Sequence, residues 1–198
     1  MISRLSRRAM TSLAASALVP WKVRLDSAIE ANRHIPGTHY FQMATVGTDG
    51  KPKSRTVVFR GFHDSSSLVV ITDARSAKMT QLQANPAFEA AWWLPQNGEQ
   101  FRLAGNIKVV NRNDDTEGLR VQMWQRLRES MRQQFFWPQP GTPFEDTPLP
   151  VVTDPTPPDT FAVLLLVPSE VKYLRLHDNF AQVDTCVAAE WSLARVNP

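Results

Sequence analysis

Residues 55–60 read R-T-V-V-F-R, and residues 71–78, beyond a predicted turn and a second apolar run, read I-T-D-A-R-S-A-K. The two segments bring cations and hydroxyls to one predicted hairpin: Arg55, Arg60, Arg75 and Lys78, with Thr56, Thr72 and Ser76. A phosphomonoester binds planar guanidinium groups, a point-charge ammonium and short hydroxyl donors, so this pattern predicts a phosphate site. An ordinary alternative stays open, because strands often carry Arg and Thr on their solvent face and helices often begin at Ser.

The spacing of Arg55 and Arg60 restricts how they act together. They are five residues apart, so on a regular strand their side chains face opposite sides of the sheet. Either a bulge intervenes between them, or the two arginines have different roles.

Hydrophobic periodicity places the other elements around these segments. A first helix is expected from Trp21, a short one from about Ser76 to Ala84, and a long one from about Asp115 to Phe136. More than half of the 15 prolines fall between residues 137 and 160, so residues 138–160 are expected to form an extended loop. Strands are expected at residues 41–46, 53–59, 68–72, 88–94, 101–110, 161–167, 171–176, 180–185 and 191–196. This order predicts a mainly β (α+β) fold, a barrel with flanking helices.

Length and charge exclude several classes of protein. A chain of 198 residues is expected to form one domain, here residues 21–198. The net charge of +3 comes from cations in the first 25 residues, and this argues against a nucleic-acid-binding surface. No apolar run approaches the ~18 residues that would span a membrane. The single cysteine, Cys186, permits no internal disulfide, as is usual in a reducing compartment.

The first 20 residues have a composition of their own. They are rich in Arg, Ser and Ala and contain no acid, and Ile2, Leu5, Ala9 and Leu13 share one helical face. This is typical of a transit peptide for a mitochondrion or a plastid. The alternative is a disordered N-terminus of a cytoplasmic protein, with Met10 as an internal start.

Five motifs in the same order resemble the pyridoxamine 5'-phosphate oxidase family. They are the R-T-V-V-F-R and I-T-D-A-R-S-A-K segments, Q-F-R-L-A-G at 100–105, R-L-H-D at 175–178 and W-S-L-A-R-V-N-P at 191–198. The R-V-N-P ending resembles the less characterised, FMN-binding branch of that family. The resemblance implies an FMN-binding split barrel, and a homodimer with a flavin in each of two interface clefts.

The resemblance also assigns the site residues. It implies FMN contacts from Arg55, Thr56, Val57, Val58, Arg60, Ile71, Thr72, Arg75, Ser76, Lys78 and Gln100. Arg175 and His177 are implied as catalytic residues that contact the substrate. On the helix that holds the substrate phosphate in the family, this chain has Trp124, Arg128 and Arg132. Here Trp124 and Arg132 replace a tyrosine and a serine, and Asn179 replaces a flavin-contacting arginine.

The resemblance thus implies a flavoprotein, an oxidoreductase acting on pyridoxamine or pyridoxine 5'-phosphate or on another small phosphorylated substrate. Two alternatives stay open: a non-catalytic split-barrel protein that binds a flavin or a related cofactor, and a flavin oxidoreductase with a different small substrate. No metal site is expected, because the four histidines are scattered and one cysteine cannot build a zinc site. The chain has no G-x-G-x-x-G segment, so a nicotinamide-binding Rossmann domain is not expected.

Overall fold

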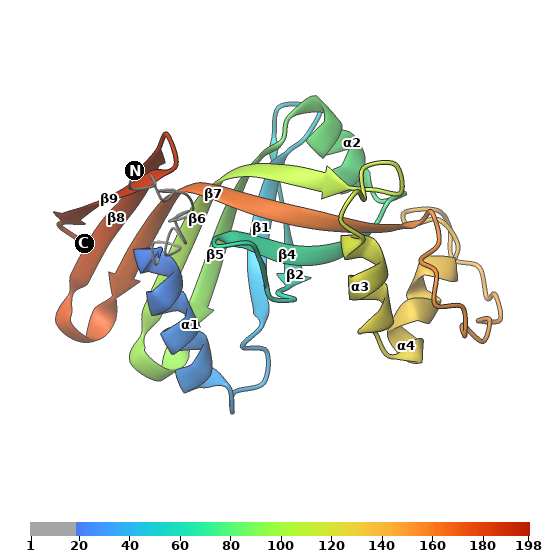
Figure 1. Ribbon diagram of the computed structural model, residues 1–198, viewed down its shortest axis with the longest axis horizontal. Coiled ribbons are helices and arrows are strands. Elements are labelled where there is room, and N and C mark those ends of the chain that lie inside the picture. Colours follow the sequence, from blue (N-terminus) through green and yellow to red (C-terminus); the bar gives the residue numbers. More distant parts are fainter. Residues whose placement is uncertain (1–18) are drawn as a thin grey trace, which may run out of the picture.

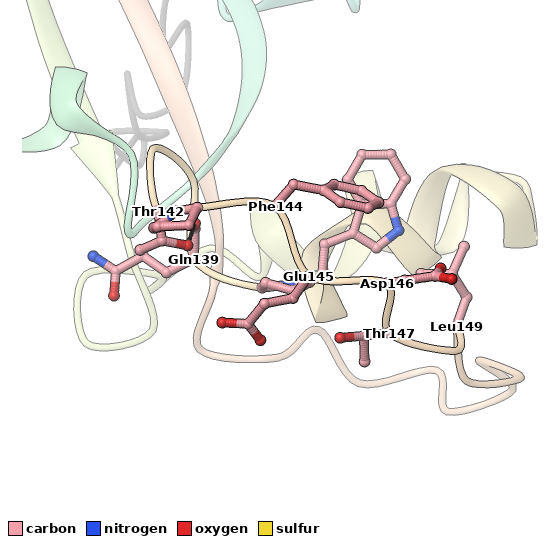
Figure 2. A pocket seen from close by; sticks show the side chains of 10 residues that line it. Gln139, Thr142, Phe144, Glu145, Asp146, Thr147 and Leu149 are labelled. Atoms are coloured by element: carbon pink, nitrogen blue, oxygen red, sulfur yellow. Dashed lines mark hydrogen bonds between the residues drawn. The ribbon is translucent and has the colours of Figure 1, made fainter.

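The computed structural model describes residues 19–198 (Figure 1). The targeting segment predicted for residues 1–20 lies outside this part of the chain, except for its last two residues. The helices are α1 (Pro20–Asn32), α2 (Ala77–Ala84), α3 (Leu119–Gln125) and α4 (Glu129–Arg132), with short 3₁₀ turns η1 (Pro95–Asn97), η2 (Gln133–Phe136) and η3 (Leu176–Asp178). No helix among the described residues is long and apolar enough to cross a membrane.

All the strands belong to one antiparallel sheet. They are β1 (Tyr40–Val46), β2 (Pro52–Val58), β3 (Phe62–His63), β4 (Ser67–Asp73), β5 (Ala87–Leu94), β6 (Glu99–Val110), β7 (Phe161–Arg175), β8 (Phe180–Val187) and β9 (Glu190–Val196). The main order is β2-β1-β5-β6-β7-β4-β3, and β8 and β9 extend the sheet from the far end of β7. The mainly β fold class is confirmed. The predicted barrel is not closed, because the strand order ends at β2 and β3 with no ladder between them in the described chain.

Two apolar clusters lie on opposite faces of the sheet at β4 and β7, because alternate residues of these strands belong to different clusters. The larger cluster surrounds Trp92, whose ring stacks on Phe41 at 5.0 Å and meets Phe59 edge-on at 5.1 Å. Its buried indole N–H donates to the carbonyl of Thr38 at 2.8 Å. The smaller cluster lies where α3 packs on β7, at the right of Figure 1, and contains Phe161. Helix α1 packs beside β5 and contributes Trp21 and Leu25 to the larger cluster.

The prediction of one long helix over residues 115–136 is wrong. The chain forms α3, breaks at Arg128 with extended backbone (φ −67°, ψ 153°), and continues as α4 and η2. The break allows Trp124 and Phe135 to pack edge-on against Phe161, at 5.2 and 4.8 Å between ring centroids. Burying one aromatic side chain stabilises by about 1.5–3 kcal/mol, more than the ~1 kcal/mol of a helical hydrogen bond, so packing decides the backbone here.

Two strand predictions also need correction. The hairpin predicted to join the R-T-V-V-F-R strand to the next one is wrong, because β2 pairs with β1 and the short β3 pairs with β4. The strands predicted at 161–167 and 171–176 are one strand, β7, because β6 pairs with it along nearly its whole length. The register shifts once, between Ala104 and Gly105, and this bulge absorbs the irregularity that suggested two strands.

Gly105 lies at that bulge, in close contact with the backbone of the neighbouring strand β7. An added Cβ would lie 2.1 Å from the carbonyl oxygen of Val167 and 2.9 Å from the Cα of Pro168. Neither atom belongs to a flexible side chain, so the strands would have to separate locally.

We expect Gly105→Ala to lower the free energy of unfolding by about 1–3 kcal/mol, the usual cost of overpacking. Urea unfolding would measure the loss, with Ala104→Ser on the adjacent residue as the control. An unchanged unfolding midpoint would contradict the close approach of β6 and β7 at this point.

Candidate functional site

A cleft of about 550 Å³ opens at the end of the sheet where β2, β4 and the start of α2 meet α4 and the segment after it. All but two of the cofactor residues predicted from the sequence line it: Arg55, Thr56, Val57, Val58, Arg60, Ile71, Thr72, Ser76 and Lys78. The exceptions are Arg75 and Gln100. The opposite wall consists of residues that sequence reasoning missed: Met131, Gln134, Phe135, Trp137, Pro138 and Pro140. The volume falls within the ~300–1,000 Å³ usual for small-molecule sites.

Lys78 lies in the first turn of α2 and is held by two hydroxyls. Its Nζ donates to the Oγ1 of Thr72 and to the Oγ of Ser76, each at 2.8 Å. Burial lowers the pKa of Lys78, and the neighbouring Arg55 lowers it further. An anion bound beside Lys78 would favour its charged form, so this group is suited to a phosphate.

Arg55 projects from β2 toward the same end of the cleft. Its Nη1 donates to the Oγ1 of Thr45 at 2.7 Å and to the carbonyl of Met43 at 3.3 Å, and its Nη2 donates to the Oε1 of Gln81 at 2.9 Å. Burial lowers the pKa of Arg55. Thr45 and Gln81 were not found from the sequence, although Gln81 lies one helical turn after Lys78 and so shares its face.

Arg60 follows β2 instead of lying within it. The strand ends at Val58, and the backbone N–H of Arg60 donates to the carbonyl of Val69 on β4. Arg55 and Arg60 can therefore line one cleft, which a single flat strand would not permit. The Nε of Arg60 is buried without a hydrogen-bond partner, and its pKa is lowered by burial and by nearby Arg128.

Arg75 does not line the cleft. Its guanidinium binds the carboxylate of Asp73 in two-pronged contact, with Nη2 to Oδ2 at 2.6 Å, and this bond raises the pKa of Arg75. Asp73 is the acid that the described residues contribute to the lining, and Arg75 neutralises it. Arg55, Arg60 and Lys78 have no carboxylate partner in the described chain, so the cleft carries an excess of positive charge.

Gln100, Arg175 and His177 lie at the other end of the sheet. Phe161, the first residue of β7, pairs with Asp73 at the cleft, whereas Arg175 is the last residue of the same strand. At ~3.3 Å per residue, 14 steps along β7 span about 46 Å. Gln100, on β6, pairs with Leu174, the residue before Arg175. Gln100, Arg175 and His177 therefore do not line the cleft of their own chain.

Arg175 is partly exposed and forms an ion pair with Asp178. Its Nε and Nη2 donate to the two carboxylate oxygens at 3.0 and 2.7 Å, so Arg175 lowers the pKa of Asp178 to about 2. His177 is exposed on the turn between them.

The three predicted substrate residues do not share a helical face, because the helix breaks between them. Trp124 is fully buried and donates its indole N–H to the carbonyl of Asp154 at 3.0 Å. Arg132 turns back onto α3, where it donates to the carbonyls of Trp124 and Gln125 at 3.1 Å. Arg128 is exposed and close enough to Arg60 to contribute to the lowering of the Arg60 pKa.

A second cavity of about 420 Å³ adjoins the cleft and shares Arg60 and Ile71 with it. It extends toward α3 and is lined further by His39, Phe59, Gly61, Met123, Arg126 and Leu127. Arg60, with its unpartnered Nε, therefore lies between the cleft that contains Lys78 and a neighbouring space of small-molecule size.

The donor set fits the phosphate end of FMN. Arg55 and Lys78 supply charge, Thr72 and Ser76 supply hydroxyls, and the N-terminus of α2 adds backbone N–H groups. The apolar lining by Val57, Val58 and residues after α4 suits a flat ring.

Comparisons with known proteins agree with this fit. The model of the pyridoxamine 5'-phosphate oxidase FMN-binding domain matches residues 18–111. The pyridoxine/pyridoxamine 5'-phosphate oxidase 2 of Arabidopsis thaliana is 37% identical over 194 residues, which cover 91% of this chain and 98% of that protein.

Solved structures show the same relationship. A pyridoxamine 5'-phosphate oxidase-related, FMN binding protein from Nostoc punctiforme has a TM-score of 0.86 and 37% identity, covering 92% of this chain and 100% of that one. PhzG from Burkholderia lata, at a TM-score of 0.67 and 16% identity over 90% of this chain and 89% of its own, shows the fold alone. The family and the FMN cofactor expected from the sequence are confirmed: the chain belongs to the pyridoxamine 5'-phosphate oxidase family of FMN-binding proteins.

Proposed function

We propose that this protein is an FMN-dependent oxidoreductase of the pyridoxamine/pyridoxine 5'-phosphate oxidase type. The observation that carries the proposal is the cleft with Arg55, Arg60 and Lys78, three cations that no carboxylate neutralises in the described chain. The name of the Arabidopsis relative supports the same reaction class.

The residues of the cleft would have distinct roles. Lys78, Thr72 and Ser76 would bind the flavin phosphate together with Arg55, since all four contribute donors to the same end. Arg60, which also lines the adjoining cavity, would contact the ring edge and an anionic group of the substrate. Bound FMN would supply the two-electron acceptor, and the protein would orient the substrate and exclude water.

We further propose that the protein works as a homodimer. Arg175, His177 and Gln100 lie far along β6 and β7 from their own cleft, so a two-fold contact is the simple way to bring such residues to a flavin. Apolar side chains are exposed around that end of the sheet, including Leu176 (53%), Trp93 (47%) and Leu193 (49%). A second copy would cover them.

Light scattering should therefore show a dimer at micromolar concentration. A sharper test mixes Lys78→Ala with Arg175→Ala subunits after joint unfolding and refolding. Random pairing would give mixed dimers with one intact site each, and activity should recover to about a quarter of wild type. A monomer with bound flavin, or no recovery in refolded mixed dimers, would contradict the shared site.

One observation favours a second candidate, a flavin protein that leaves the B6 phosphates unoxidised. Trp124 is buried in the core and Arg132 is bound to backbone carbonyls, so two of the three residues implied for the substrate phosphate are occupied elsewhere. On this basis we expect weak turnover of pyridoxine 5'-phosphate.

The absorption spectrum of the purified protein separates these candidates. A flavin spectrum that bleaches when pyridoxine 5'-phosphate is added without oxygen supports the oxidase. A flavin spectrum that does not change with any B6 phosphate supports the second candidate. A colourless protein that binds no added FMN would overturn both.

A further inference from the structure

Gln81 and Thr45 enclose the guanidinium of Arg55 in a closed set of hydrogen bonds. Arg55 donates to the Oγ1 of Thr45 at 2.7 Å and to the Oε1 of Gln81 at 2.9 Å, while the hydroxyl of Thr45 donates to the same Oε1 at 2.7 Å. A guanidinium only donates, so the atom of Gln81 that faces it is the oxygen. Thr45 is almost completely buried, so its direction is fixed by packing.

These partners come from two elements that meet beside the cleft. Thr45 lies on β1, on the strand next to Arg55, and Gln81 lies on α2, one turn after Lys78. Helix α2 packs against β1. The guanidinium is thus fixed between a strand and the helix that carries the ammonium of Lys78.

A contrast within the same site shows why neutral partners matter. Arg75 is bound by the carboxylate of Asp73 and does not line the cleft, whereas Arg55 is bound only by neutral oxygens and lines it. A carboxylate would have oriented Arg55 equally well, but it would also have cancelled the charge that attracts a phosphate dianion.

We propose that Gln81 and Thr45 are positioning residues that aim Arg55 at the flavin phosphate while leaving its charge uncompensated. This inference rests on the proposed phosphate site and goes further, because it assigns part of the affinity to two side chains that bind no ligand atom. The neutrality of position 81 is the specific feature: glutamine orients the arginine, and glutamate would orient and neutralise it.

The experiment compares FMN with riboflavin, which has the same ring and no phosphate. In Gln81→Glu, the dissociation constant for FMN should rise about tenfold or more, while that for riboflavin should change less than twofold. Gln83→Glu is the matched control, because Gln83 is exposed on the same helix and receives the same charge. It should change both constants less than twofold.

A double-mutant cycle tests the action through Arg55. Gln81→Leu should weaken FMN binding severalfold in the wild-type background and less than twofold when Arg55 is already alanine. Equal effects in both backgrounds, or equal loss of FMN and riboflavin in Gln81→Glu, would show a merely structural role and overturn the inference. A wild-type protein with no preference for FMN over riboflavin would instead overturn the phosphate site itself, and this inference with it.

Discussion

Replacing Lys78 with alanine should leave the purified protein largely without FMN. The Nζ of Lys78 is the ammonium at the phosphate end of the cleft, and it lies between the hydroxyls of Thr72 and Ser76. Losing one charge-assisted contact to a phosphate costs about 1.5–3 kcal/mol, or roughly tenfold or more in affinity. Adding Arg55→Ala should weaken binding further. Flavin fluorescence titration measures both effects.

The pH dependence provides an independent check on Lys78. Burial and Arg55 lower its pKa in the free protein, so the charged form is present below that pKa and is lost as pH rises through it. The affinity for FMN should therefore begin to fall at a lower pH than an ordinary lysine would give.

Lys53→Ala, on β2, is the control for Lys78→Ala and should retain FMN. Retention of FMN by Lys78→Ala would remove the phosphate assignment.

Replacing Arg175 with alanine should lower turnover by about a hundredfold and leave the FMN content unchanged. An orienting contact acts on the transition state, and a misplaced substrate costs on the order of 10² in rate. Arg175 binds Asp178 and does not line the cleft that contains Arg55 and Lys78, so the contacts to the flavin phosphate should not change. The measurements are kcat with pyridoxine 5'-phosphate and the flavin-to-protein ratio.

Arg102→Ala is the matched control for Arg175, because Arg102 is a surface arginine on β6 that pairs with Glu89. It should leave both measurements unchanged. Equal loss of FMN and turnover in Arg175→Ala would make Arg175 a flavin anchor. If the wild type binds FMN and oxidises no B6 phosphate, the narrower function fails and the flavin-binding protein remains.

Local patterns predicted most of the sheet and the centre of the cleft. The strands and α1 follow from apolar periodicity, and Lys78, Thr72 and Ser76 lie together because a strand and a short helix bring them within a few residues of one another. The family and its cofactor followed from motif order. These predictions depend on interactions close along the chain.

The remaining features depend on distant parts of the chain. The break at Arg128 results from Trp124 and Phe135 packing on Phe161, some 25 or more residues away. The hydrogen bonds of Gln81 to Arg55 depend on α2 packing against β1, which no local pattern shows. Arg75 is different: its partner Asp73 is two residues away, so the D-A-R spacing already contained the signal for that ion pair.

The late position of β7 in the chain has a consequence for biosynthesis. Strand β7 lies between β4 and β6 and pairs with both of them, although it begins only at Phe161. A nascent chain that has emerged only through Thr160 therefore exposes two apolar strand edges, and such edges pair readily with other chains. The sheet is completed only when the last fifth of the protein has left the ribosome, and a premature stop before Phe161 would remove the strand that joins β2-β1-β5-β6 to β4-β3.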